Sequence, residues 1–324
     1  MQRWPWLVGG NHFYLQLCRL FDQWLKASFS RQTDLLVVLS GVGLNSFLAA
    51  KKASIATVLD CGSTHTDFQH QIVLDEFRRN GITKPLFPKG YRDRVRQEFA
   101  EADFIQIPTQ FVGQTFLNAE IPKEKLLYAP YGTDLTLFKP REKPDGRTPF
   151  RVICASGVNL RKGARVLAEA WRKLNWADAE LHWVGQPTPE TQHLFTSSMP
   201  GLVWHSQMHH HELAELYRQC DVMTLPSFEE GLARVIIEAA ASGLPCIVTP
   251  NSGAGDFFTP GDPEGWLIPV NDIDALCDAL KAARENREKT FALGQRAAKR
   301  AQSFSWDAYG RRVKENYKCV LGKT

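Results

Sequence analysis

The stretch PSFEEGLARVIIEAAASGLPCIVTPNSGAGDFF, residues 226–258, decides the fold of this chain. It follows an apolar run at Val222–Leu225 and begins with a charged, glycine-bearing turn at Glu229–Gly231. The segment Leu232–Ser242 then has helical composition and ends at a glycine with a proline close behind, which is typical of a helix C-terminus. A second apolar run follows at Pro245–Val248. Strand, helix and strand in this order predict one crossover unit of a parallel sheet.

The same alternation continues in both directions along the chain, which predicts two consecutive doubly wound α/β halves. In the C-terminal half, strands are predicted at Arg151–Ala155, Glu180–Val184, Leu202–His205, Val222–Leu225, Pro245–Val248 and Trp266–Ile268, with helices at Ala164–Leu174, Leu213–Cys220 and Leu232–Ser242. In the N-terminal half, an amphipathic helix is predicted at Phe13–Phe29 and strands at Leu35–Leu39, Ile55–Leu59, Phe104–Ile107 and Leu126–Ala129. Ligands of such sheets bind beyond the carboxyl ends of the strands.

A linker separates the two halves. Lys139–Pro149, KPREKPDGRTP, contains prolines, a glycine and mostly charged residues, so it has little to bury. We therefore expect an N-terminal Rossmann-like domain at residues 1–142 and a C-terminal domain at residues 143–302. The segment 303–324, which contains FSWDAYGRRVKENYKCVL, is expected to form a helix that crosses back to the first domain.

Composition bounds the class of protein. The 324 residues are 44% hydrophobic and 23% charged, which indicates a globular chain, and the formal charge of +4 is small for a nucleic-acid-binding protein. The seven cysteines are scattered without a C-x-x-C pair, which favours reduced thiols and hence the cytoplasm. No signal peptide is recognisable, and the longest apolar stretch, Leu35–Leu44, is too short to span a bilayer. These observations are compatible with peripheral association with a membrane.

Charged residues gather in two strand-to-helix loops of the C-terminal half. After Leu225, Gly231 allows close approach to the backbone, and a helix expected to begin near Leu232 offers free N–H groups, an arrangement that suits phosphate. After the strand ending at Ala155, the loop SGVNLRKG places the cations Arg161 and Lys162. Since both loops follow strand carboxyl ends, they are expected to converge on one cleft.

A carboxylate on an otherwise apolar helix is the other candidate. Glu238 lies among alanines and isoleucines, and burial of an unpaired carboxylate is costly. A ribose diol, with two adjacent donors, would satisfy it.

Several motifs in this order resemble glycosyltransferase family 4, also described as glycosyl transferases group 1. They are the E-x₇-E element Glu230…Glu238, the loop Arg161-Lys162-Gly163, the segment LPCIVTPNSGAGD, the segment YAPYGTDLTLFKP at Tyr128–Pro140, and CGSTHTDFQHQI at Cys61–Ile72. The resemblance covers most of the chain. It implies the GT-B fold, with two Rossmann-like domains facing across a cleft.

The resemblance also implies a function. The chain would be a retaining, hexosyltransferase-type glycosyltransferase that moves a sugar from a nucleotide-sugar to a saccharide, lipid-linked or small-molecule acceptor. No metal and no cofactor would be needed, because the nucleotide-sugar is a co-substrate. Arg161 and Lys162 would neutralise the donor diphosphate, and Glu230 would hydrogen-bond the donor sugar. Gly231, Leu232 and Ala233 would supply backbone contacts, Glu238 would hold the ribose, and His65 would face the reacting centre.

The N-terminus departs from the family pattern. The family's first domain opens with a strand and a glycine-rich loop, whereas Gly9-Gly10 follow no convincing strand here. We therefore expect the N-terminal domain to lack its first strand. This departure leaves open an alternative, a truncated or degenerate sugar-nucleotide-binding protein without transfer activity.

Four further patterns have competing interpretations. LLVVLSGVGLNS at Leu35–Ser46, with Asp60 beyond it, approaches a dinucleotide fingerprint and supports a minor alternative, an NAD-dependent oxidoreductase. Asp272 and Asp274 mimic a metal motif, but we interpret them as helix-capping groups. His209–His211 lack the neighbours of a metal site. The basic stretch Arg78–Arg96 is interleaved with acids, so a solvated face is the default and an anionic-lipid patch the alternative.

Overall fold

The computed structural model describes residues 12–30, 32–142, 149–195 and 198–322. Its contacts divide the chain into two compact units, Met1–Pro130 with Gly310–Thr324, and Tyr131–Tyr309. Residues 131–142 are thus grouped with the second unit, ahead of the linker that set the boundary in the sequence. The domain limits expected at 142 and 302 stay predictions. No described helix has both the length and the apolar run needed to cross a bilayer.

The first unit is built on a parallel sheet of four strands within the described residues. These strands are β1 (Leu35–Leu39), β2 (Ala56–Asp60), β3 (Phe104–Ile107) and β4 (Leu126–Tyr128), in the order β1-β2-β3-β4. All four predicted strands are confirmed to within a residue or two. Gly9-Gly10 lie outside the described residues, so the predicted lack of an earlier strand stays a prediction.

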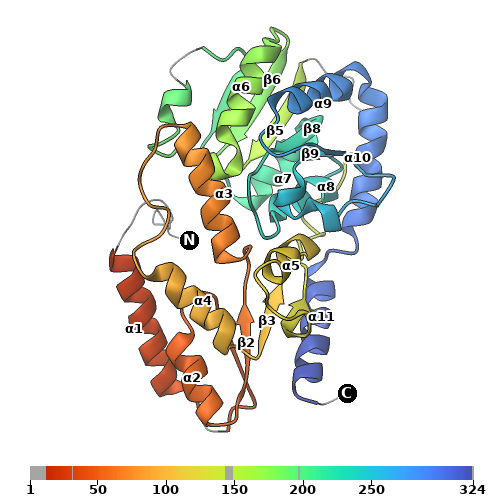
Figure 1. Ribbon diagram of the computed structural model, residues 1–324. Helices are drawn as coiled ribbons and strands as arrows, with labels where there is room; N and C mark the ends of the chain where they lie inside the picture. The colour runs from red at the N-terminus through yellow and green to blue at the C-terminus, as the bar shows by residue number, and fades with distance from the viewer. Residues whose placement is uncertain (1–11, 31, 143–148, 196–197, 323–324) are drawn as a thin grey trace. The chain divides into compact units, whose positions relative to one another are not determined.

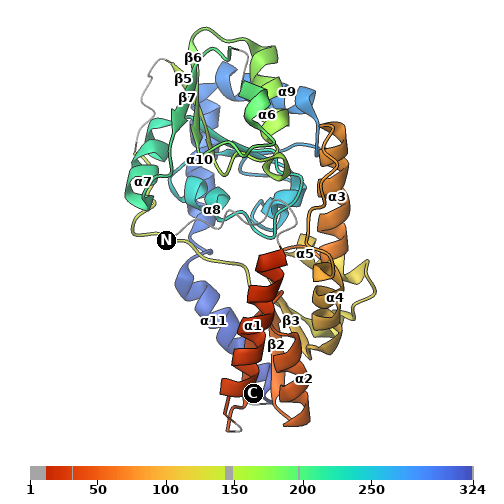
Figure 2. The same ribbon diagram turned by 90° about the vertical axis from the view of Figure 1, so that its left-hand side faces the viewer.

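One helix precedes this sheet along the chain, and further helices connect its strands (Figures 1 and 2). They are α1 (His12–Ser28), α2 (Leu44–Lys52), α3 (Thr66–Arg79), α4 (Tyr91–Glu101) and α5 (Gln110–Leu117). The last helix among the described residues is α11 (Trp306–Val320), which groups with the first unit from Gly310 onward. There Asn316 donates a side-chain hydrogen bond to the carbonyl of Tyr128 at 3.2 Å. The core beneath includes the fully buried Phe47, Phe116 and Ile105.

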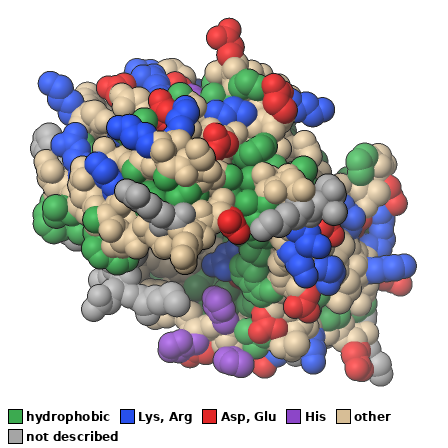
Figure 3. All heavy atoms as spheres, turned by 90° about the horizontal axis from the view of Figure 1, so that it is seen from below, with side chains coloured by type: hydrophobic (Ala, Val, Ile, Leu, Met, Phe, Trp, Pro, Cys, Tyr) green, Lys and Arg blue, Asp and Glu red, His purple; other side chains and the backbone are tan. Residues whose placement is uncertain are grey.

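The helix α1 has two apolar faces. Leu15 and Cys18 are buried, as expected for the face turned to the core. The opposite face keeps large apolar side chains in solvent, including Phe13, Leu20 and Trp24, each more than 60% exposed. Figure 3 shows from below that hydrophobic side chains reach the surface between charged ones. The apolar pattern of this segment therefore predicted the helix correctly but overstated how much of it is buried.

The second unit contains a parallel sheet of six strands. They are β5 (Phe150–Ala155), β6 (Ala179–Val184), β7 (Leu202–His205), β8 (Val222–Leu225), β9 (Cys246–Val248) and β10 (Trp266–Leu267), in the order β10-β9-β8-β5-β6-β7. The six predicted strands are confirmed. The order reverses between β5 and β8, so this is the topological switch point of a doubly wound sheet.

The helices of this unit are α6 (Ala164–Leu174), α7 (His210–Gln219), α8 (Arg234–Ala241), α9 (Ile273–Glu285) and α10 (Arg287–Ala301). Alternation of apolar and charged residues places Val166, Leu167 and Trp171 of α6 in the core, with exposures of 1% or less. The pairs α6 with α9 and α8 with α10 pack against each other, and they lie together in both ribbon views (Figures 1 and 2).

Candidate functional site

Two loops meet at the switch point of the second unit. One follows β5 and runs from residue 156 to 163, and the other follows β8 and runs from residue 226 to 233. Because β5 and β8 are neighbouring parallel strands, their carboxyl ends lie at the same edge of the sheet. The backbone N–H of Phe228 donates to the carbonyl of Arg161 at 2.8 Å, which ties the loops directly to each other. The predicted convergence of these loops is confirmed.

Four charged side chains form a cation–carboxylate cluster at this point: Arg161, Lys162, Glu229 and Glu230. Arg161 Nη1 donates to the carbonyl oxygen of Glu229 at 2.9 Å and to its Oε2 at 3.1 Å, and it lies 3.3 Å from Glu230 Oε1. Lys162 Nζ forms an ion pair with the same Glu230 oxygen. Glu229 is fully buried and Glu230 is 7% exposed. The cluster is thus a compact set of desolvated charges, with its two cations held side by side.

Burial acts on the two cations with different results. At Lys162, burial lowers the pKa below its ordinary value even though Glu230 opposes this effect. At Arg161, burial also disfavours the charge, but Glu230 and Glu229 together outweigh it and raise the pKa. Arg161 is therefore a permanent cation, whereas the charge of Lys162 depends on keeping an anion beside it.

A third loop, after β9, supports the loop that carries the glutamates. The backbone N–H of Glu230 donates to the carbonyl of Asn251 at 2.8 Å, and Asn251 Nδ2 donates to the carbonyl of Phe228 at 2.9 Å. The backbone N–H of Ala233 donates to the carbonyl of Ser252 at 3.1 Å. Since this bond holds Ala233 in extended backbone, α8 begins at Arg234 and the helix start predicted near Leu232 is wrong by two residues.

This bond also bears on the predicted backbone contacts. Of Gly231, Leu232 and Ala233, the last has its N–H engaged by another loop. An anion could use that N–H only if the loop moved.

Glu238 lies on the same helix, in its buried part. Its exposure is 5%, and burial raises the pKa of its carboxyl above the ordinary value, while Arg234 and His210 oppose that effect. Among the described residues it shares no ion pair with the cation–carboxylate cluster. The predicted set is thus split, with Arg161, Lys162 and Glu230 in contact and Glu238 further along α8.

His65 lies in the first unit and is 6% exposed. The ring nitrogen Nδ1 of His65 accepts the backbone N–H of Asp67 at 3.3 Å, which caps the start of α3. The backbone N–H of His65 donates to Thr115 Oγ1 at 2.9 Å. The ring packs against Phe99 and Phe116, and burial lowers the pKa of the imidazole. These contacts give His65 a structural role, and its role toward a reacting centre stays a prediction.

In the segment Leu35–Ser46, which approaches a dinucleotide fingerprint, carboxylates of the protein itself accept the N–H groups that a phosphate would use. Glu98 accepts the backbone N–H groups of Gly41 and Gly43 at 2.5 and 2.9 Å. Asp22 accepts the backbone N–H and the hydroxyl of Ser46 at 2.9 and 2.7 Å. Both carboxylates are fully buried. A pyrophosphate at this helix start would meet two carboxylates, so the structure argues against the NAD-dependent alternative.

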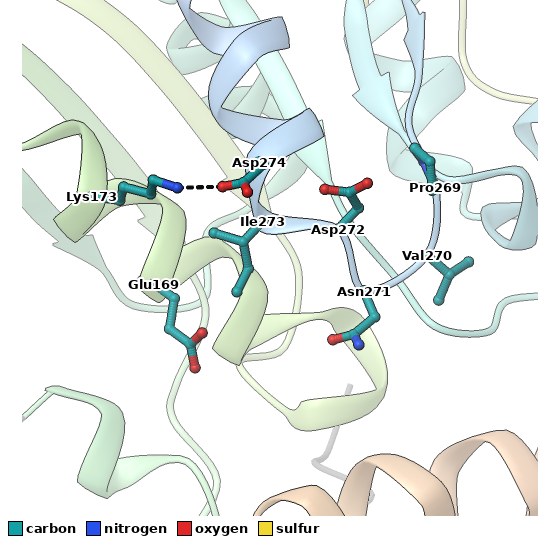
Figure 4. A pocket seen from close by; sticks show the side chains of 8 residues that line it. All are labelled: Glu169, Lys173, Pro269, Val270, Asn271, Asp272, Ile273 and Asp274. Carbon is teal, nitrogen blue, oxygen red and sulfur yellow. Dashed lines mark hydrogen bonds and ion pairs between the residues drawn. The ribbon is translucent and has the colours of Figure 1, made fainter.

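The two aspartates at the start of α9, Asp272 and Asp274, both have partners. Asp272 caps the helix by accepting the backbone N–H of Ala275 at 2.8 Å, as predicted, and Asp274 pairs with Lys173 of α6. They border an open hollow of about 630 Å³, in which Figure 4 shows Lys173 directed at Asp274 and away from Asp272. The hollow is lined by Glu169, Lys173 and residues 269–274.

The histidine triplet begins α7. The backbone N–H of His209 donates to Glu212 at 2.7 Å in a capping box. Within the part of the chain that the structure describes, no group of three or more His, Cys, Asp or Glu side chains is placed to hold a metal ion.

Two functional residues were missed from the sequence. Glu229 positions Arg161 from a fully buried site, and Asn251 fixes the loop between β8 and α8. The doubled glutamate at 229–230 was a signal for the first of these. Nothing in the local sequence identified Asn251, because its partners lie on a different loop.

Comparisons with known proteins agree with this geometry. Residues 149–286 match the family model described as glycosyl transferases group 1. The putative colanic acid biosynthesis glycosyltransferase WcaL of Escherichia coli K12 is 29% identical over 209 residues, which cover 59% of this chain and 50% of that protein. The MMP alpha-(1->4)-mannosyltransferase of Mycolicibacterium hassiacum is 25% identical over 252 residues, which cover 74% of this chain and 60% of that protein. The chain therefore spans about half to three-fifths of the length of these relatives.

Solved structures with the same fold include a sucrose-phosphate synthase from Thermosynechococcus elongatus, with a TM-score of 0.71 and 20% identity over 90% of this chain and 74% of that one. HepE of Anabaena, solved in complex with UDP-glucose, has a TM-score of 0.71 and 17% identity over 94% of this chain and 83% of that one. These likenesses show the GT-B fold, with its two Rossmann-like units, that the sequence predicted.

Proposed function

Because residues 149–286 belong to the glycosyl transferases group 1 family, we propose that this chain is a glycosyltransferase that takes its sugar from a nucleotide-sugar donor. The observation that carries the proposal is the cation–carboxylate cluster at the switch point. Two cations side by side suit a diphosphate, and the carboxylate of Glu230 suits sugar hydroxyl groups. The relatives named above as glycosyltransferases support the same assignment.

In this proposal the donor changes the partners inside the cluster. Lys162 is paired with Glu230, so a diphosphate would compete for Lys162 and release Glu230 toward the sugar. Glu229 would keep Arg161 in place throughout, because it is fully buried and bonded to the guanidinium. The backbone of Gly231 and Leu232 would line the phosphate side, and Glu238 would accept the ribose hydroxyls.

The chemical step that we propose is retaining and needs no metal. Arg161 and Lys162 would stabilise the charge that develops on the departing diphosphate, which is the electrostatic task that a divalent cation performs elsewhere. The acceptor would attack from the face on which the diphosphate leaves, with His65 beside it. A saccharide, a lipid-linked sugar or a small molecule would serve as acceptor.

The test of this function is direct. UDP- and GDP-sugars are titrated into the full chain by calorimetry, and the anomeric configuration of any product is read by NMR. We expect saturable binding of a nucleotide-sugar and an α-linked product from an α-linked donor. If no nucleotide-sugar binds at millimolar concentration, the proposed function is wrong.

The pH dependence of donor binding is expected to follow Glu238. Burial raises the pKa of this carboxyl, and its charged form is the stronger acceptor for the two hydroxyls of a ribose. Affinity should therefore decline as the pH falls through the raised pKa, at a higher pH than an ordinary glutamate would require. The measurement is the dissociation constant of the bound nucleotide between about pH 5 and 8, the range in which folded proteins are usually most stable.

The matched variant is Glu238→Gln, which keeps the size of the side chain. It should bind about tenfold more weakly at neutral pH, and the acid-side decline should vanish. A decline that persists in Glu238→Gln would assign the pH dependence to another group.

Chelation is expected to leave transfer unchanged. The two cations of the cluster take the position where a metal would stabilise the diphosphate, and Asp272 and Asp274 already have partners within the protein. The measurement is the initial rate before and after EDTA treatment, followed by manganese addition. Activity lost with EDTA and restored by manganese would overturn the metal-independent proposal.

A further inference from the structure

A second cluster of charged and polar side chains lies in the first unit, between α3 and α4. We name it the α3–α4 arginine cluster and define it as Thr66, Asp67 and His70 of α3 with Arg92 and Arg96 of α4. Arg92 Nη2 donates to Asp67 Oδ1 at 2.7 Å, and Arg96 Nη2 donates to the same oxygen at 2.7 Å. Two guanidinium groups thus converge on one carboxylate at the start of α3.

Three polar atoms of this cluster are buried and have no hydrogen-bond partner among the described residues. They are the hydroxyl of Thr66, Nδ1 of His70 and Nε of Arg92. Thr66 and His70 are four residues apart on α3 and therefore share a face, with Asp67 and its arginines beside them. Buried polar groups in native proteins nearly always have a partner. Three such atoms, two of them within one helical turn of Asp67 and the third on its partner Arg92, indicate that a polar group binds beside Asp67.

The hydrogen-bond donors of the cluster, and not its net charge, suit an anion. Asp67 and Asp93 balance the two arginines, since Arg96 Nη1 also donates to Asp93 at 3.0 Å. Asp67 occupies Nη2 of Arg92, however, and Nε of the same guanidinium is left without an acceptor. The side chains of Arg92 and Arg96 are 30% and 43% exposed, so part of each lies at the surface, while Nε of Arg92 is buried beneath it. His70 stacks on Phe87 and can donate from a ring nitrogen in its neutral form.

We propose that the α3–α4 arginine cluster binds a phosphate group carried by the acceptor. A guanidinium, a hydroxyl and an imidazole are donors on two different helices, and together they suit a tetrahedral oxyanion with several oxygens. The acceptor assignment rests on the proposed function, whereas the binding of phosphate by these residues does not.

The experiment measures phosphate binding by calorimetry on the full chain with Lys162→Ala, which removes a cation of the donor cluster. Inorganic phosphate should bind this protein, and the added change Arg92→Gln should weaken binding at least tenfold. Thr66→Val should also weaken it, several-fold, while leaving the arginines on Asp67. The control is Arg78→Gln, also on α3, whose arginine is 64% exposed and pairs with Asp75; it should bind phosphate unchanged.

A second arm distinguishes a lipid headgroup from a soluble phosphate ester. Vesicles of phosphatidylcholine with phosphatidic acid are sedimented with the same proteins. Vesicle binding that is lost with Arg92→Gln and competed by inorganic phosphate would assign the phosphate to a lipid acceptor. The absence of vesicle binding alongside phosphate binding would assign it to a soluble one.

If Arg92→Gln and Thr66→Val bind both phosphate and vesicles as tightly as their parent, the cluster is not a phosphate site. The result does not depend on transfer activity. A chain that binds no nucleotide-sugar but binds phosphate through Arg92 would overturn the proposed function and leave this site standing.

Discussion

Replacement of Lys162 by alanine is expected to weaken nucleotide-sugar binding by roughly 10- to 150-fold, the loss of one charged hydrogen bond. The diphosphate loses one of the two cations that would neutralise it. Arg161 cannot make up this loss, because Glu229 holds its guanidinium. The measurement is the dissociation constant of the nucleotide-sugar by calorimetry, at fixed ionic strength.

The control for this prediction is Lys173→Ala. Lys173 lies on the helix that follows the same loop, but its side chain is 58% exposed and pairs with Asp274. An exposed pair of this kind contributes little, so donor affinity should stay within twofold of the parent. Equal affinities for Lys162→Ala and the parent would show that the diphosphate does not bind at the cation–carboxylate cluster.

Replacement of Gly163 by alanine is expected to destabilise the second unit by about 2–5 kcal/mol. Gly163 has a φ of +78°, a left-handed conformation that alanine adopts only at a cost. A Cβ at this position would also lie 2.1 Å from the carbonyl oxygen of Pro226, which no real contact permits. The loops after β5 and β8 would have to separate, and with them the cations and the glutamates. Chemical denaturation measures the stability, and calorimetry measures the accompanying loss of donor affinity.

Gly255→Ala is the matched control. Gly255 lies in the loop after β9, its φ is not positive, and a Cβ there would have no heavy atom within 4 Å. Its effect should stay within about 0.5 kcal/mol. If Gly163→Ala were as stable as Gly255→Ala, the close approach of the two loops would be wrong.

The sequence by itself determined the elements of the fold. Each predicted strand was a short run rich in apolar residues and bounded by turn-forming or charged residues. All ten are present in the structure, for example at Leu35–Leu39 and Val222–Leu225. Local signals suffice for this, because hydrophobic periodicity and capping chemistry act over a few residues. The same local logic identified Asp272 as a cap and Arg161, Lys162 and Glu230 as loop residues at strand ends.

The tertiary structure alone decided which of these residues meet, since contact depends on strand order. The neighbouring positions of β5 and β8 place Glu229 on Arg161, although the two residues lie far apart in the chain. The hydrogen bond from the N–H of Ala233 to the carbonyl of Ser252 makes α8 begin at Arg234, although the local sequence predicts a start near Leu232. Glu98 and Asp22 turn a sequence that resembles a phosphate loop into a site already filled by carboxylates, because helices distant in sequence pack against its glycines. Long-range hydrogen bonds of this kind leave no periodic trace in the sequence, so only the folded chain shows them.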